Sequence, residues 1–519
     1  MSLLVQCWAL LMSLLLYVTC LVVYRLWFHP LARFPGPKTA AATKWYEFYF
    51  DIVKRPGGTF MYEIHRMHDV YGPIVRINPD EIHVHDPEWL DVLYTVAPKS
   101  VRDGYEPAAP LTDTQSLVFG TVPHDLYRKR RAPLNPLFSK GAVKASETMM
   151  YEQAELLCES VRKQLDQNGI AEMRLNFTAW ATDVIANLVL PKPLHLLKDQ
   201  QAAANYHLTT NATIWLTPLQ KQFPWLIETA LRLPLALVKL MSPNLARSVA
   251  LYRDMLRQAE AAIGEFSDWT DKPPSQVSMK NDLGMNAFQA IISCESLPAQ
   301  EKEADRIAQE AYILIAAASV TTAVVLMTAT YHLLMHKNDY LARLKEELET
   351  VMEDPYTRVD VRTLEQLPWL SAVIKESLRI TGLVSSRLPL VSPKDTLRYG
   401  KWNIPAGTPV SMTPRDVLFD PSYFPEPSKF LPERWLSNNP GLARMERVFI
   451  PYGRGPRICL GMSLGHSELY IAMACLFRRF NLELHETVRE RDVDGVRDCF
   501  AIEPSLESRG VRVRLAKTE

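Results

Sequence analysis

Residues 451–465 read Pro-Tyr-Gly-Arg-Gly-Pro-Arg-Ile-Cys-Leu-Gly-Met-Ser-Leu-Gly. This stretch places one cysteine, Cys459, two residues after Arg457 and among closely spaced glycines. Glycine has no side chain and tolerates positive φ, so such a loop can turn tightly and lie against a flat group. The glycines concerned are Gly453, Gly455 and Gly461.

The residues that follow predict a helix from Met462 to Phe480, because apolar side chains recur at helical spacing. A thiolate just before a helix N-terminus is stabilised by the free N–H groups there, which can also tune its donation to a metal. A soft anionic sulfur beside an arginine suits a haem iron and its propionates. We therefore interpret Cys459 as an axial metal ligand; a buried, inert cysteine is the alternative.

The segment from Tyr452 to Gly461 resembles the Phe/Tyr-x-x-Gly-x-Arg-x-Cys-x-Gly signature of the cytochrome P450 superfamily, with tyrosine where phenylalanine is usual. The resemblance implies a mainly α fold with small β-sheets behind a single N-terminal transmembrane helix. It also implies haem b (iron protoporphyrin IX) with Cys459 as the axial thiolate. The residues implied to bind this cofactor are Tyr452, Gly453, Gly455, Arg457, Cys459 and Gly461.

The composition excludes several classes of protein. Lys plus Arg and Asp plus Glu number 58 each, so nothing indicates a nucleic-acid partner. The seven cysteines show no paired C-x-x-C spacing, which argues against a zinc site built on cysteines and against a disulfide framework. The 519 residues contain no flexible linker after residue 40, and we interpret them as one large catalytic domain behind an anchor.

The N-terminal segment predicts a membrane anchor. Residues 1–24 carry no charge, and an apolar helix of about 20 residues crosses a bilayer. A cleaved signal peptide fits less well, because the apolar run is long and lacks a basic start. Basic residues follow the span at Arg25, Arg33 and Lys38, which places the rest of the chain in the cytosol. The expected organisation is an anchor over 1–25, a proline-rich hinge over 26–40 and a catalytic domain over 41–519, at the endoplasmic reticulum membrane.

The hinge resembles that of microsomal family members. Its sequence from His29 to Pro37 contains three prolines, which cannot continue a helix. Together with Trp45-Tyr46-Glu47 and the segment 71–79, it looks most like fungal enzymes of the trichodiene-oxygenase type. Alternating residues over 74–77 and 82–85 predict a hairpin, and a last strand is predicted over 511–515.

A helix that begins near Asp125 carries four successive basic residues. Tyr127 and Arg131 are four residues apart and share a helix face. They resemble the family's Trp-x-x-x-Arg, whose arginine holds a haem propionate, so both are expected at the haem edge. We expect Lys129 and Arg130 to point elsewhere and hypothesise that they dock an acidic electron donor.

Residues 301–337 predict the longest helix of the chain. Its middle resembles the family's Ala-Gly-x-Asp/Glu-Thr-Thr/Ser, matched by Ala317, Ala318, Thr321 and Thr322. The resemblance implies that Thr321 passes protons during oxygen activation, with Ala317 against the haem. Val320 stands where the acid is usual, and Thr322 has helix packing as an alternative role.

Glu376, Arg379 and Arg434 resemble the family's buried structural triad, which holds the cysteine loop and takes no part in the chemistry. Arg387 lies in a segment expected to pass near the haem, and it is a further candidate for a propionate. The apolar stretch 231–241 has two interpretations, a core helix or a loop that dips into the bilayer. Residues 499–501 are expected to line the pocket.

These observations predict a monooxygenase that hydroxylates or epoxidises a small lipophilic secondary metabolite, a terpenoid or a polyketide. Electrons come from NADPH indirectly, through NADPH-cytochrome P450 reductase, with cytochrome b5 as a further donor. One alternative is a reductase-independent isomerase or dehydratase, which the missing acid at Val320 favours and Thr321 disfavours. The other is a non-catalytic haem-binding or lipid-binding membrane protein.

Overall fold

A computed structural model describes residues 3–95, 100–105, 117–270 and 285–516. The helices are α1 (Leu3–Val23), α2 (Lys38–Ala42), α3 (Trp45–Phe48), α4 (Phe60–Tyr71), α5 (Leu90–Leu93), α6 (His124–Arg131), α7 (Lys140–Ala145), α8 (Glu147–Asn168), α9 (Met173–Val189), α10 (Gln200–Trp215), α11 (Thr217–Gln222), α12 (Trp225–Arg232), α13 (Leu235–Met241), α14 (Pro243–Thr270), α15 (Ala287–Ile292), α16 (Ala304–Met335), α17 (Ala342–Glu349), α18 (Val361–Glu365), α19 (Pro368–Thr381), α20 (Pro414–Leu418), α21 (Leu442–Val448), α22 (Met462–Arg479) and α23 (Arg489–Asp492). The strands are β1 (Ile74–Arg76), β2 (Ile82–Val84), β3 (Ala171–Glu172), β4 (Leu390–Val391), β5 (Leu397–Tyr399), β6 (Trp402–Ile404), β7 (Pro409–Ser411), β8 (Leu482–Leu484), β9 (Arg497–Cys499), β10 (Ala501–Glu503) and β11 (Arg512–Leu515).

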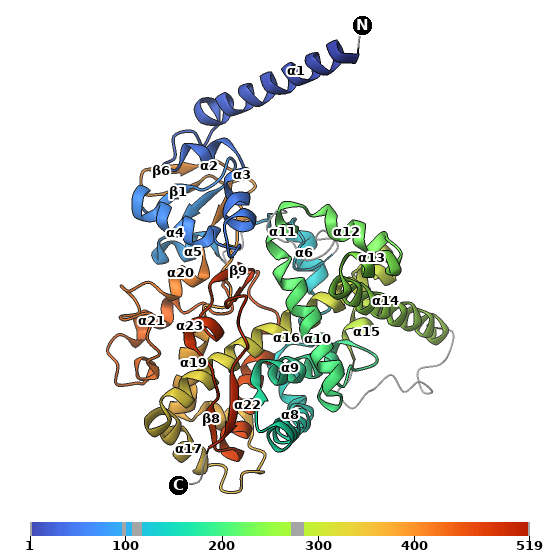
Figure 1. The fold of residues 1–519 in the computed structure, drawn as a ribbon, viewed down its shortest axis with the longest axis vertical. Coiled ribbons are helices and arrows are strands. Elements are labelled where there is room, and N and C mark those ends of the chain that lie inside the picture. The colour runs from blue at the N-terminus through green and yellow to red at the C-terminus, as the bar shows by residue number, and fades with distance from the viewer. Residues whose placement is uncertain (1–2, 96–99, 106–116, 271–284, 517–519) are drawn as a thin grey trace.

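Helix α1 projects away from the body of the protein and packs against none of it (Figure 1). With the turn Tyr24–Phe28 it forms an apolar span whose mean hydropathy is 2.2, long enough to cross a membrane. The helix α16 is also apolar enough, but 72% of its most apolar window is buried inside the fold. The two helices therefore differ in role: α1 fits a membrane anchor, and α16 is the core helix of a globular domain.

The helical turn after α1 continues through Phe28, which lies within the segment predicted as the hinge. The residues after it are tied to the domain. Phe34 stacks on Trp402 with ring centroids 5.0 Å apart, and the Arg76 guanidinium donates to the Arg25 carbonyl at 2.9 Å. The path from anchor to domain is therefore fixed by contacts as well as by proline stiffness.

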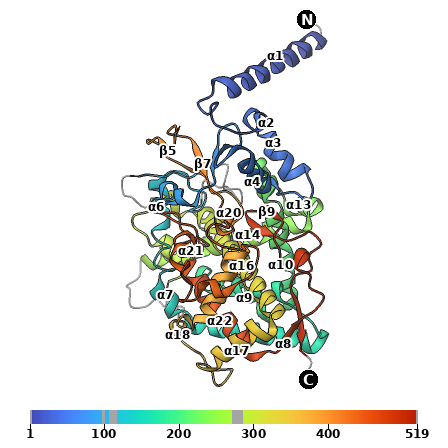
Figure 2. The ribbon, with the colours of Figure 1, turned by 90° about the vertical axis from the view of Figure 1, so that its left-hand side faces the viewer.

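The centre of the molecule is α16, which crosses the body and packs against α9, α14, α19 and α22 (Figure 2). Its buried positions are mostly alanine and branched aliphatic residues, which allow neighbouring helices to approach closely. One polar contact fixes the register of α9 on α16, since the Thr182 hydroxyl donates to Ser319 Oγ at 2.8 Å. The prediction of a long central helix is confirmed.

Within the described residues, four small sheets lie around this helical body. Their strand orders are β1-β2-β7-β4, β3-β11-β8, β10-β9 and β5-β6. The predicted hairpin is present, with β1 antiparallel to β2, and the predicted last strand is β11, which pairs with β8 and β3. Because β4 and β7 follow β2 by some 300 residues, this sheet joins an N-terminal segment of the domain to a much later one.

The apolar stretch 231–241 forms the end of α12 and the whole of α13. Val238 is buried, whereas Leu240 and Met241 are 83% and 68% exposed. A core helix would bury these side chains. The contacts therefore favour the interpretation in which this segment presents an apolar edge outward.

The predicted triad is assembled and buried. Arg379 holds Glu376 in a two-pronged pair at 2.7 and 2.9 Å, and Arg434 Nε lies 3.2 Å from the same carboxylate. The Trp435 indole N–H donates to Glu376 at 2.9 Å, and the Leu431 amide donates at 3.0 Å. One carboxylate thus joins α19 to the segment that leads toward the cysteine loop.

We expect Glu376→Gln to lower the free energy of unfolding by about 3–5 kcal/mol, because it leaves two buried arginines without a counter-charge. Thermal unfolding of the purified protein measures this. The matched control is Glu446→Gln, which breaks the half-exposed pair between Glu446 and Lys375, the neighbour of Glu376, and costs at most about 1 kcal/mol. Equal losses in the two variants would contradict a structural role for the triad.

Candidate haem-thiolate site

The loop before α22 is folded by its glycines. Gly453 and Gly455 have φ of 75° and 81°, a region that favours glycine. The Cys459 amide donates to the Tyr452 carbonyl at 2.9 Å, and the Ile458 amide donates to the Gly455 carbonyl at 3.0 Å. Gly461 is the residue immediately before α22. The cysteine therefore sits at the start of a helix, as predicted.

Gly455 also allows a close approach between two segments. A Cβ atom built on it would lie 2.5 Å from the Tyr94 carbonyl oxygen, much too close for any side chain. The Tyr94 hydroxyl donates to the Leu388 carbonyl at 3.3 Å. One residue thus connects the cysteine loop to the segment around Arg387.

The Cys459 side chain is accessible although it lies within the fold. Burial of its surroundings raises the pKa of the thiol, while the Gly461 N–H and the charge of Arg131 act in the opposite direction. The residues from 451 to 463 are likewise half-buried or exposed, whereas the following turns of α22 are mostly buried. The sulfur is therefore accessible to a ligand, although the helix that follows it is buried.

Two guanidinium groups lie beside this loop. Arg131 donates to the Ile458 carbonyl at 2.7 Å and to the Tyr127 hydroxyl at 2.5 Å. Arg457 lies over the Tyr127 ring, 4.2 Å from its centroid, and donates to the Val122 carbonyl at 3.0 Å. Its Nε is buried and has no partner, and within the described residues no carboxylate pairs with either arginine. Burial lowers the pKa of Arg457, as does the charge of Arg131, while Tyr127 and the Asp103 carboxylate act in the opposite direction.

Two half-buried guanidinium groups side by side, neither of them hydrogen-bonded to a carboxylate, favour the binding of an anion between them. The group that this site fits therefore brings an iron or similar soft centre for the sulfur and carboxylates for the arginines. Haem meets both needs. Tyr127, Arg131 and Arg457 are thus brought together as the sequence predicted.

On α16, the predicted residues divide into two faces. Ala317 is exposed and Ala318 and Thr321 are half-buried, although most of this helix is buried. The Thr321 hydroxyl donates to the Ala317 carbonyl at 2.8 Å, and Val320 is buried. Ala317, Ala318 and Thr321 are therefore accessible on an otherwise buried helix, as expected of residues above a haem.

Thr322 does not share that face. Its hydroxyl is buried and donates to Glu468 Oε2 on α22 at 2.7 Å, which supports the packing role and not a catalytic one. Burial raises the pKa of the Glu468 carboxyl to about 8, opposed by the Thr322 hydrogen bond. Residue spacing did not single out Glu468 as a candidate. Its signal was a single acid within the apolar middle of a predicted core helix.

The contacts of Arg387 do not fit a role in binding a haem propionate. Its guanidinium contacts Glu81 at 2.7 and 3.1 Å and Glu47 at 3.0 and 3.0 Å, so its donors are occupied by two buried carboxylates. The expectation for Arg387 is therefore not supported by its contacts. It lines a polar cavity of about 240 Å³ together with other charged side chains. These are Lys44, Lys221, Glu47, Glu81 and Asp498.

The position of Arg130 contradicts the expectation that it docks an electron donor. It is buried and forms a two-pronged pair with Glu301 at 2.7 and 2.8 Å, so it cannot dock an electron donor. Lys129 is exposed, and its docking role stays a prediction.

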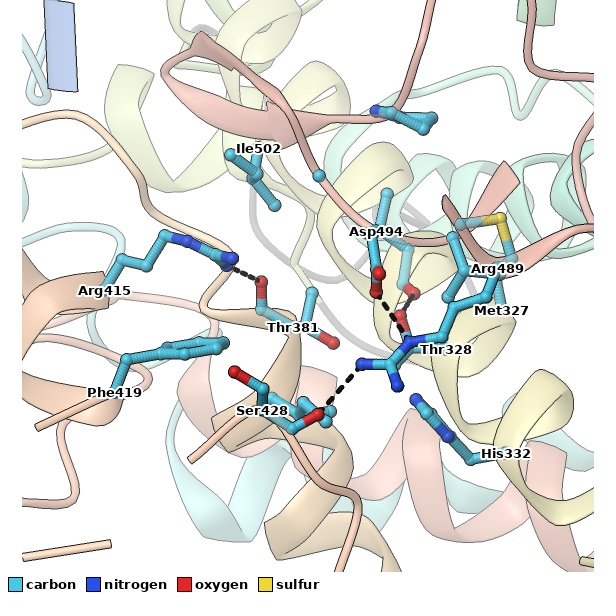
Figure 3. Close-up of a pocket in the computed structure, with 15 residues that line it drawn as sticks. Met327, Thr328, His332, Thr381, Arg415, Phe419, Ser428, Arg489, Asp494 and Ile502 are labelled. Carbon is cyan, nitrogen blue, oxygen red and sulfur yellow. Dashed lines mark hydrogen bonds and ion pairs between the residues drawn. The ribbon is translucent and has the colours of Figure 1, made fainter. Parts of the chain in front are cut away.

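A second cavity, of about 160 Å³, lies beside the C-terminal half of α16 (Figure 3). Arg489 points toward Asp494 and Ser428 there, with Nε 3.1 Å from the Asp494 carboxylate. Arg415 donates to the Thr381 carbonyl at 2.8 Å. No residue of the cysteine loop lines this cavity, and its charged groups already have partners. It is therefore separate from the site around Cys459.

An accessible cysteine at a helix start, two neighbouring arginines without a carboxylate partner in the described residues and an alanine–threonine helix face are the features expected of a haem-thiolate protein. The chain matches the cytochrome P450 family over residues 42–505 and belongs to it. It is 37% identical over 504 residues to cytochrome P450 monooxygenase sdnE of Sordaria araneosa, covering 96% of each chain. It is 39% identical over 497 residues to tryptophan 6-hydroxylase fscE of Fusarium equiseti, covering 96% and 94%. It is 36% identical over 514 residues to N-acetyltryptophan 6-hydroxylase ivoC of Emericella nidulans, covering 98% and 97%.

We expect Gly455→Ala to abolish haem incorporation, because the added methyl group meets the Tyr94 carbonyl and pushes the cysteine loop away. The haem-to-protein absorbance ratio of the purified protein measures this. Gly453→Ala is the matched control, since it has a similar φ but no atom within 4 Å of the added methyl. A normal haem content in Gly455→Ala would contradict the packing of the loop on Tyr94.

Glu468 makes stability depend on pH. From about pH 4.5 to about pH 8 the native state holds a proton that the unfolded state has lost. The free energy of unfolding therefore falls with rising pH, by up to about 1.4 kcal/mol per pH unit from this group. We expect Glu468→Gln to lose this pH dependence. The melting temperature of the variant relative to that of the wild type should therefore rise as the pH increases from about 5 to about 8. Parallel melting profiles, followed across this range, would show that the carboxyl is not protonated in the fold.

Proposed function

We propose that this protein is a membrane-bound haem-thiolate monooxygenase that hydroxylates or epoxidises a small secondary metabolite. The observation that carries the proposal is the accessible Cys459 beside Arg131 and Arg457, which have no carboxylate partner in the described chain. When bound, haem would supply the oxidant that inserts an oxygen atom from O2 into a C–H or C=C bond.

The chain's own residues then have separate tasks. Cys459 would hold the iron and donate charge to it, and Arg131 and Arg457 would hold the propionates. Ala317 and Ala318 leave room beside α16, because their side chains are small. The Thr321 hydroxyl, which donates to Ala317 in this structure, would turn to hold and pass protons. With Val320 in place of an acid, those protons have to reach Thr321 through water.

The relatives bear on the substrate. Two of them are named for tryptophan and N-acetyltryptophan as substrates, and both molecules have an aromatic body and an ionic end. An aromatic amino acid derivative is therefore the second candidate beside the terpenoid or polyketide. The polar cavity around Arg387 is not lined by the cysteine loop or by α16, and most of its charges pair with one another.

The apolar surfaces of the protein support a location at a membrane. We place residues 1–25 in the endoplasmic reticulum membrane, with the hinge over 26–40 and the catalytic domain over 41–519 in the cytosol. The exposed apolar residues of α13 support a second contact with the bilayer. NADPH-cytochrome P450 reductase and cytochrome b5 are the proposed electron donors, with Lys129 at the docking surface.

Expression in yeast microsomes with a reductase tests the function. The expected result is an oxygenated product that requires both NADPH and O2, from a panel of terpenoids, polyketides, tryptophan, N-acetyltryptophan and indole. Tighter binding of tryptophan than of indole, followed by haem absorption, would support an ionic end. A product formed without NADPH would favour the isomerase alternative. Haem binding without turnover of any compound would favour the non-catalytic one.

We expect Thr321→Ala to lower product formed per NADPH consumed by about tenfold or more, because proton delivery fails while electrons still arrive. Simultaneous measurement of product and NADPH gives this ratio. Thr328→Ala is the control, since the Thr328 hydroxyl also donates to a carbonyl four residues earlier on α16 but lines the other cavity. Equal ratios in the two variants would remove Thr321 from the mechanism.

A further inference from the structure

Four of the twelve histidines gather in one place, far from the cysteine loop in sequence. His65 and His68 lie on α4, His83 lies on β2, and His85 follows β2. The rings of His65 and His85 have centroids 5.7 Å apart, and those of His68 and His85 are 5.3 Å apart. Asp416 on α20 reaches the same place.

The inner two histidines are fully engaged. His68 Nε2 and His83 Nδ1 share a hydrogen bond of 2.7 Å, while His68 Nδ1 contacts the Gly72 carbonyl at 2.8 Å. His83 Nε2 contacts the Thr413 hydroxyl at 2.9 Å. Every ring nitrogen of this pair therefore has a hydrogen-bond partner within the protein, so neither histidine has a nitrogen left for a further ligand.

The outer three side chains are different. One ligand atom from each of His65, His85 and Asp416 lies within 4.8 Å of the other two. Asp416 Oδ2 is buried and has no hydrogen-bond partner. Arg415, the nearest cation in sequence, is turned away, since it donates to the Thr381 carbonyl and lies over the Phe419 ring. A buried carboxylate oxygen without a donor needs an explanation, and a cation is the simplest one.

We propose that His65, His85 and Asp416 form a binding site for a divalent first-row transition metal ion, with Zn²⁺ as its best-suited occupant. Two imidazoles and a carboxylate, with water in the remaining position, are a ligand set that Zn²⁺ uses. A bound Zn²⁺ would bring the ligand atoms to about 3.4 Å from one another. His65 is exposed and can move inward, while His85 and Asp416 are partly buried.

The site joins elements that are distant in the chain. It connects α4 and the end of β2 to α20, which follows β7 of the same sheet. Such a metal would cross-link the N-terminal part of the domain to the segment after β7. This role is independent of the haem and of the proposed oxygenation.

Titration calorimetry with ZnCl2 on the EDTA-treated, haem-loaded, full-length protein tests the proposal. We expect one equivalent to bind with a dissociation constant in the micromolar range or below. At a hundredfold excess over that constant, the melting temperature should rise by about 3 °C. Both effects should be lost in His65→Gln and in Asp416→Asn, with binding at least tenfold weaker. His485→Gln, a histidine outside the cluster, should bind Zn²⁺ as the wild type does.

His65 is exposed, so His65→Gln keeps the fold, and its reduced, carbon-monoxide-treated absorption spectrum verifies this. Wild-type protein that takes up no Zn²⁺ at about 100 µM would overturn the proposal. Uptake that is equal in the wild type and His65→Gln would also overturn it, since the metal would then be bound elsewhere.

Discussion

The site depends on a charged sulfur being held next to an open space inside a mostly apolar fold. A free thiolate is unfavourable there, because burial raises the pKa of Cys459. The helix start, the Gly461 N–H and the charge of Arg131 offset part of this cost. An iron bound to the sulfur would remove the rest, since metal coordination requires the deprotonated form. The same reasoning applies to the half-buried Arg457, which a bound carboxylate would stabilise.

Several other buried charges pair within the protein. Glu376 holds two arginines, Arg387 is held by Glu47 and Glu81, and Arg130 is held by Glu301. Most of these pairs join segments that are far apart in sequence, so they fix how the helical body and the small sheets meet. Arg131 and Arg457 lack a carboxylate partner within the described chain, as do the buried Arg76 and Arg497. What distinguishes Arg131 and Arg457 is their place beside the cysteine loop.

The elements that sequence predicted well carry their information locally. The cysteine loop, the alanine–threonine stretch of α16 and the hairpin of β1 and β2 each depend on residues a few positions apart. Contacts between distant segments were not predictable in this way. Spacing alone could not tell which of the successive basic residues of α6 turns inward, so Arg130 was assigned to the surface. Likewise Arg387 finds Glu47 and Glu81 some 300 residues earlier, and Thr322 finds Glu468 on another helix.

The central claim is that Cys459 binds haem iron as a thiolate. The direct measurement is the absorption spectrum of the reduced, carbon-monoxide-treated protein, for the wild type and for Cys459→Ala. The wild type should show the red-shifted Soret band of a thiolate-bound haem, and the variant should lack it. A band that persists in the variant, or that is absent from haem-loaded wild type, would contradict this account.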